Sequence, residues 1–132
     1  MRYVVAAMLV IVGAIHLLPL SGVLSAEWLT ALYGVSFSDP NLVILMRHRA
    51  VLFGLLGLFL MFAALRRSMQ PAAFVAGFVS VLSFLFLAWS VGGYNAQIGR
   101  VFVADIVAFI CLLIGVAAYA YGARNDMRKE LG

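Results

Sequence analysis

The sequence predicts an all-α fold: an integral membrane protein built as an antiparallel four-helix bundle, with a single domain over residues 1–132. Hydrophobic residues make up 66% of the chain and charged residues only 11%, and the mean hydropathy is +1.12. This composition leaves too little polar surface to cover a soluble globule. The apolar residues also fall in runs that are long enough to cross a bilayer as helices. These runs are 3–20, 41–65, 71–91 and 101–121.

The first predicted span, 3–20, ends near the helix-breaking Pro19. Its length as a helix nearly matches the thickness of the hydrocarbon core of a bilayer. His16 is its one strongly polar side chain, and it shares a helical face with Leu9 and Gly13. We therefore expect His16 to face other helices.

Between the first two spans, residues 21–39 contain a short stretch with helical periodicity. Ser25 suits the N-cap of such a helix, and Glu27 suits its first turn. Trp28 and Tyr33 are side chains typical of a membrane edge, so we expect a short interfacial helix between the first two spans. A lid over a functional site is the alternative.

The second span carries the most unusual charges of the chain. Asp39 as N-cap and Pro40 as first helical residue mark its start. An Arg-His-Arg cluster at 47–49 then leads into an uncharged run, which Arg66 and Arg67 close. Charged groups inside an apolar run are costly in a bilayer and usually face the bundle interior, water or a partner.

The last two spans differ in charge. Pro71 opens the third span, which has no charged residue and ends at a Gly-Gly pair. The fourth span extends from about Arg100 to Tyr121, contains Asp105 and is followed by a polar tail. Because the connections are short, neighbouring spans should pack antiparallel.

Basic residues predict the orientation in the membrane. Six of them fall on one side and three on the other. The larger group is Arg2, Arg66, Arg67, Arg124, Arg128 and Lys129, and the smaller group is Arg47, Arg49 and Arg100. The positive-inside rule therefore places both termini of this multi-pass protein in the cytoplasm. Membrane lipids are then the expected partners, and nucleic acid is not, despite the net charge of +4.

Three polar groups are predicted to meet in the outer half of the bundle. His16, Arg47 and Asp105 come from three different spans and lie at similar depths. Arg47 shares a helical stripe with Gly54 and Gly57, and such small residues let membrane helices approach closely. We therefore expect Arg47 to point inward and to form an ion pair with Asp105. The pair either locks two helices together or belongs, with His16, to a pocket for a small hydrophobic, amphipathic or anionic ligand or a lipid.

His48 and Arg49 are further candidates for ligand binding. Each shares its helical face with large apolar residues, so we expect their side chains to reach toward the lipid head groups. His16 and His48 also permit a different interpretation, axial ligation of haem b between two spans, with Arg47 or Arg49 near the propionates. Cys111 is the single cysteine, so neither an intrachain disulfide nor a Cys-based metal site can form. We predict no metal site and no catalytic residue.

Four segments carry a resemblance to known proteins: HLLPLSG at His16, ALYG at Ala31, NLVILMRHRAVLFGLLG at Asn41 and WSVGGYN at Trp89. Over its whole length the chain resembles small bacterial four-span membrane proteins that carry the label phosphopantetheine adenylyltransferase. The soluble enzymes of that name have an α/β fold and an H-x-G-H motif. Neither His16 nor His48 begins such a motif, so the sequence does not support that activity. The resemblance to bacterial proteins implies that the membrane is a bacterial inner membrane.

The chain also resembles the DoxX-like four-helix membrane proteins. This resemblance rests on length, on the four spans and on the glycine-rich second span that follows an arginine. Members of that family include quinone-linked oxidoreductase subunits. The resemblance implies a fold and transfers no catalytic residue.

The leading functional interpretation is a non-enzymatic membrane protein that binds a ligand in its outer polar layer. One alternative is a membrane redox subunit or small membrane enzyme, haem- or quinone-linked, with His16 as acid, base or haem contact. Another is an oligomeric transporter or channel, because four spans seldom enclose a path alone. The third span, rich in phenylalanine and free of charge, permits a homo-oligomer.

Overall fold

The computed structural model describes residues 1–130, and this part of the chain is helical almost throughout, without a strand. The elements are α1 (Arg2–Leu17), the 3₁₀ turn η1 (Leu18–Val23), α2 (Ala26–Tyr33), α3 (Pro40–Leu65), the 3₁₀ turn η2 (Arg67–Met69), α4 (Gln70–Val91) and α5 (Ala96–Glu130). Four helical segments are long and apolar enough to cross a membrane: Arg2–Val23, Pro40–Leu65, Arg67–Val91 and Ala96–Asn125. The predicted all-α class and its four long apolar helices are therefore confirmed.

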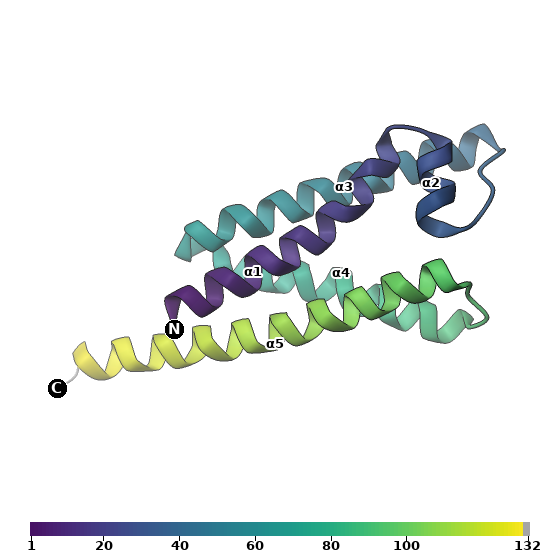
Figure 1. Ribbon diagram of the computed structural model, residues 1–132. Coiled ribbons are helices and arrows are strands. Elements are labelled where there is room, and N and C mark those ends of the chain that lie inside the picture. The colour runs from purple at the N-terminus through teal and green to yellow at the C-terminus, as the bar shows by residue number, and fades with distance from the viewer. Residues whose placement is uncertain (131–132) are drawn as a thin grey trace.

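The four long helices lie along one another, and the short helix α2 sits at one end of them (Figure 1). The start of the chain, the α3–α4 turn and the described end of α5 lie at the opposite end. Two predicted boundaries differ in the structure. The fourth long helix begins at Ala96, and the predicted polar tail after Tyr121 continues it as helix through Glu130.

Local sequence signals explain where the helices α2 and α3 begin. Asp39 caps α3 by accepting a hydrogen bond from the backbone N–H of Asn41 at 2.8 Å, and Pro40 follows as its first residue. Ser25 caps α2 by accepting from the N–H of Trp28 at 3.4 Å. The Ser25 hydrogen bond also lowers the pKa of the exposed Glu27. The predicted caps of both helices are therefore confirmed.

Helices α1 and α3 approach closely at two glycines. A Cβ atom added to Gly13 would lie 2.8 Å from the carbonyl oxygen of Gly57, and a Cβ on Gly57 would lie 2.8 Å from that of Gly13. One turn further along, a Cβ on Gly54 would meet a methyl group of Leu20 at 2.6 Å. The glycine stripe of α3 is thus the seam along which α1 and η1 pack.

The buried faces of α1 and α5 agree with the periodicity of the sequence. His16 is buried on α1 together with Leu9 and Gly13. On α5, Asp105 shares its buried face with Ala108 and Leu112, one and two turns further along the helix. The polar groups of these two helices therefore face the interior of the described structure.

The serines of α4 do not mark its packed face. Ser83 and Ser90 are exposed, while Phe74 and Val81 from the neighbouring face are buried. Each of these serines donates its hydroxyl hydrogen to a carbonyl oxygen of its own helix, at 2.9 and 3.0 Å. An exposed serine on a helix thus needs no partner from another helix, so small polar residues did not mark the packed face.

Candidate functional site

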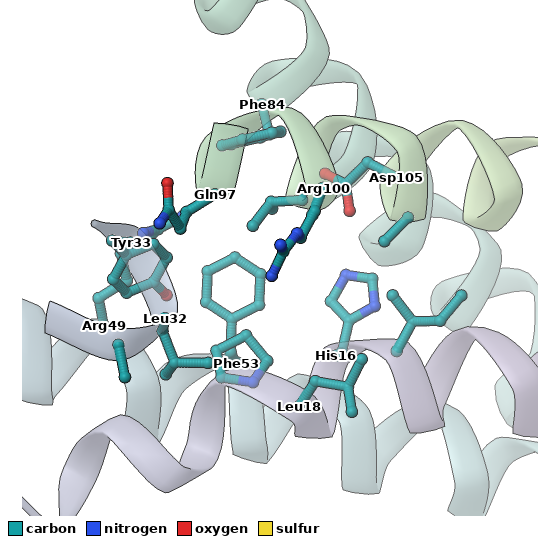
Figure 2. Close-up of a pocket in the computed structure, with 15 residues that line it drawn as sticks. His16, Leu18, Leu32, Tyr33, Arg49, Phe53, Phe84, Gln97, Arg100 and Asp105 are labelled. Atoms are coloured by element: carbon teal, nitrogen blue, oxygen red, sulfur yellow. The ribbon is translucent and has the colours of Figure 1, made fainter. Parts of the chain in front are cut away.

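A cavity of about 240 Å³ lies beside α2, where α1, α3 and α5 come together (Figure 2). Its walls are mostly apolar, with a few polar groups at defined positions, as is usual for small-molecule sites. Among the apolar lining residues are Leu18, Pro19, Leu32, Phe53, Phe84 and Val101. The polar lining residues are His16, Tyr33, Arg49, Gln97, Arg100 and Asp105.

His16 forms part of the wall with both of its ring nitrogens engaged. Its side chain is 2% exposed, and its Nδ1–H donates to the carbonyl oxygen of Val12 at 2.9 Å. In the neutral ring, Nε2 then accepts a hydrogen bond from the hydroxyl of Ser80 on α4, at 3.1 Å. The ring also stacks on Phe53, with centroids 5.6 Å apart. His16 is therefore held as a rigid wall element.

Arg49 lies against two aromatic rings of the cavity wall. Its guanidinium carbon is 4.9 Å from the ring centre of Phe53 and 5.4 Å from that of Tyr33. Cation–π contacts of this kind hold the charge over the ring faces. They leave the N–H groups at the edge of the guanidinium free to donate to a ligand.

Tyr33 ends α2 and closes the cavity on the side of that helix. The residue is only 4% exposed. Burial raises the pKa of the Tyr33 phenol, and the positive charge of Arg49 acts in the opposite direction. No hydrogen-bond partner of the Tyr33 hydroxyl is found among the described residues. The hydroxyl therefore remains able to bind a group inside the cavity.

Helix α5 contributes three polar side chains to the cavity wall. Gln97, Arg100 and Asp105 all line it, although Arg100 stands five residues before Asp105 and therefore about 140° from it around the helix axis. Figure 2 shows Arg100 and Asp105 directed toward the side of the cavity where His16 and Phe53 lie. Asp105 is 7% exposed, yet its carboxyl oxygens have no hydrogen bond or ion pair with any other described residue. Because no fully buried side-chain oxygen among the described residues lacks a hydrogen-bond partner, the unpaired oxygens of Asp105 keep some accessible surface, and this carboxyl is an acceptor without a protein donor.

The helix α2 is tied to α5 by one asparagine. The side-chain amide of Asn95 donates to the carbonyl oxygens of Tyr33 and Gly34, at 2.8 and 3.3 Å. Its side-chain oxygen accepts from the N–H of Ile98 at 2.9 Å and so caps the start of α5. Asn95 thereby fixes Tyr33 beside the polar residues of α5.

The predicted ion pair between Arg47 and Asp105 was wrong. Arg47 is exposed, and its Nε–H donates to the carbonyl oxygen of Val23 at 2.7 Å. Val23 is the last residue of η1, where carbonyl oxygens lack helical partners and a positive charge is favourable. The expectation that Arg49 reaches for the head groups was also wrong, because it is half-buried in the cavity wall. Arg47 thus binds η1 to α3, and Arg49 occupies the inward position that was predicted for Arg47.

His48 is exposed and does not line the cavity. Both ring nitrogens of His16 are hydrogen-bonded within the described structure, and axial ligation of haem b by His16 and His48 stays a prediction. Among the described residues, no three His, Cys, Asp or Glu side chains come together as metal ligands would.

Three polar lining residues were not predicted from the sequence: Tyr33, Gln97 and Arg100. A signal for one of them exists, because the stripe of α5 that contains Asp105 continues backward through Val101 to Gln97 at spacings of four residues. Arg100 lies off this stripe. Tyr33 was assigned to the membrane edge because its ring is amphipathic, and nothing in its local sequence shows that α2 folds back over α5.

Comparison of the chain with protein-family models, curated proteins and solved structures finds no match. We therefore argue function from the cavity and the residues that line it.

Proposed function

We propose that the chain is a multi-pass membrane protein, an antiparallel four-helix bundle that binds a small amphipathic anion in the cavity beside α2. Large apolar side chains on the outer surface support the membrane setting, since Leu65, Val75, Trp89 and Val91 are each more than half exposed. The arginines beside the α3–α4 turn lie at the same end as the chain start, which supports a cytoplasmic location for that end. The cavity and α2, as an interfacial helix, then face the outer side of a bacterial inner membrane.

The charge of the cavity favours an anion. Arg49 and Arg100 bring two positive charges to its wall, and Asp105 supplies one negative charge when ionised. One positive charge is thus left without a counter-charge among the lining residues. In surroundings this apolar an uncompensated charge attracts an anion strongly, and guanidinium groups bind carboxylates or phosphates through paired N–H donors. The apolar remainder of the wall suits a hydrophobic body on the same molecule.

The single observation that carries this proposal is the position of Arg49. Its guanidinium carbon lies over the Phe53 ring, 4.9 Å from the ring centre, and the side chain lines the cavity without a hydrogen bond to any other described residue. An arginine that served only the fold would use its donors on protein acceptors, as Arg47 does on Val23. Arg49 keeps them available.

Benzoate is a suitable probe because it joins a carboxylate to a compact apolar ring, and benzamide is its neutral counterpart. We expect calorimetry on the protein in nanodiscs of zwitterionic lipid to give benzoate at least a tenfold advantage over benzamide, the scale of charge-assisted hydrogen bonds. Arg49→Gln should remove about tenfold in benzoate affinity, and Arg100→Gln should remove less because Arg100 is exposed. Arg66→Gln, directly after the C-terminal end of the helix that carries Arg49 and far from the cavity, is the charge-matched control and should bind like the wild type. Equal affinities for the two probes would refute the proposal.

A further inference from the structure

The cavity contains a polar feature that an anion alone does not use. Asp105 is 7% exposed, lines the cavity and has no donor among the described residues. The unpaired oxygens of Asp105 keep some accessible surface, so a molecule in the cavity can reach them. A ligand that excludes water from the cavity must give them a donor, because leaving them unpaired costs their full desolvation free energy. A second anion cannot satisfy Asp105, since a carboxylate repels it. A hydrogen-bond donor can.

We propose that the ligand has two polar ends: an acid group that Arg49 and Arg100 bind, and a hydroxyl that donates to Asp105. This inference rests on the proposed function, because it names the class of molecule that the same cavity takes. The ligand is then a small, largely apolar hydroxy acid. Its acid group accepts hydrogen bonds from the two guanidinium groups. Its hydroxyl donates to Asp105 the hydrogen bond that no described residue donates.

The charges of the lining residues favour a hydroxyl over an ammonium group as the donor. With Asp105 ionised, the two arginines leave one positive charge in excess, and a singly charged acid neutralises it. A neutral hydroxyl keeps the occupied cavity neutral. An ammonium group would restore an uncompensated positive charge inside apolar walls, which is costly.

The shape of the wall adds a preference for a flat molecule. Four planar groups follow one another along one side of the cavity: His16 stacks on Phe53, and Arg49 lies over both Phe53 and Tyr33. The rings of His16 and Phe53 have centroids 5.6 Å apart and planes that differ by 27°, and the Arg49 guanidinium carbon is 4.9 Å from the ring centre of Phe53 and 5.4 Å from that of Tyr33. An aromatic ring in the cavity can rest against this side, with its substituents directed toward Asp105 and the arginines.

The test compares benzoate, 4-hydroxybenzoate, 3-hydroxybenzoate and the methoxy analogue of each, with the same protein and the same calorimetry. We expect one hydroxybenzoate isomer to bind about tenfold more tightly than its methoxy analogue, which keeps the oxygen but has no hydrogen to donate. Aminomethylbenzoate carries an ammonium group in place of the hydroxyl and should bind more weakly than the preferred hydroxybenzoate.

Asp105→Asn is the matched variant, since it keeps the shape and replaces the charged acceptor with a weaker one. It should reduce the preference for hydroxyl over methoxy severalfold while benzoate still binds. If neither hydroxyl isomer exceeds its methoxy analogue on the wild-type protein, the inference is overturned although anion binding stands. If benzoate itself does not bind in preference to benzamide, the proposed function fails, and this inference fails with it.

Discussion

Replacing Gly13 with alanine tests the contact that aligns α1 with α3 and so brings His16 against Phe53. The added Cβ would lie 2.8 Å from the backbone carbonyl oxygen of Gly57, whereas ordinary contacts begin at 3.4 Å. A backbone oxygen inside a helix cannot turn away as a side chain can, so the two helices must move apart. Overpacking of this kind costs about 1–3 kcal/mol.

Gly99→Ala is the matched control, because it makes the same change in another apolar helix. There the added Cβ would have one neighbour, the Cε2 atom of Tyr94 at 3.8 Å, which is an ordinary contact. Both substitutions gain about 1 kcal/mol of helix propensity. The difference between the two variants therefore isolates the packing cost and should amount to about 1–3 kcal/mol.

The measurement is thermal unfolding in a mild detergent, followed by circular dichroism. We expect Gly13→Ala to unfold at a lower temperature than the wild type and Gly99→Ala to unfold at the same temperature or higher. Gly57→Ala should behave like Gly13→Ala because it breaks the same contact, and the double variant should cost less than the sum of the two. Equal unfolding temperatures for the Gly13 and Gly99 variants would show that α1 and α3 do not approach as the structure has them.

Two further predictions concern the connection between α2 and α5. Asn95→Ala removes the hydrogen bonds to the carbonyl oxygen of Tyr33 and to the N–H of Ile98. The amide hydrogens of α2 should then exchange faster while those of α1 do not, and loss of the cap should lower the unfolding free energy by about 1 kcal/mol. Unchanged exchange in α2 would contradict the anchoring role of Asn95. Because burial raises the pKa of Tyr33 above its ordinary value of 10.0, the folded state holds the phenol proton more tightly than the unfolded state. The contribution of the protonated phenol to stability is present below pH 10 and is lost as the pH rises through the raised pKa, so the unfolding free energy declines over this range. Tyr33→Phe should flatten this decline. An identical decline in the variant would refute a raised pKa of Tyr33 as its cause.

The sequence was sufficient for the features that depend on neighbours along the chain. Long apolar runs set the four helices, because a helix that satisfies its own backbone is the favoured form of such a run in an apolar setting. Asp39 with Pro40, and Ser25, set two helix starts through hydrogen bonds that span three residues or fewer. The face of His16 on α1 and the face of Asp105 on α5 followed from the period of 3.6 residues.

Features that depend on how helices meet were harder to predict. Tyr33 lines the cavity because Asn95, 62 residues further along the chain, donates a hydrogen bond to the end of α2. No local sequence pattern predicts the contact between Asn95 and α2, because an asparagine after a Gly-Gly pair is equally suited to a simple turn. Tyr33 therefore lies in the cavity wall because of a tertiary contact, although its amphipathic ring alone predicts a position at the membrane edge.

The choice between Arg47 and Arg49 shows why a glycine stripe was a misleading guide to the site. The stripe was identified correctly: Arg47 lies on the same side of α3 as Gly54 and Gly57, and it contacts η1 as they contact Leu20 and α1. A seam of close packing, however, has no room for a cavity, because the backbones themselves touch there. Space for a ligand arises where larger side chains hold helices apart, and on α3 that is the adjacent face, where Arg49 precedes Phe53 by one turn. Among helices packed in this way, a charged residue on the glycine stripe should therefore stabilise helix packing. A charged residue next to an aromatic residue on the neighbouring stripe should be the one that binds a ligand.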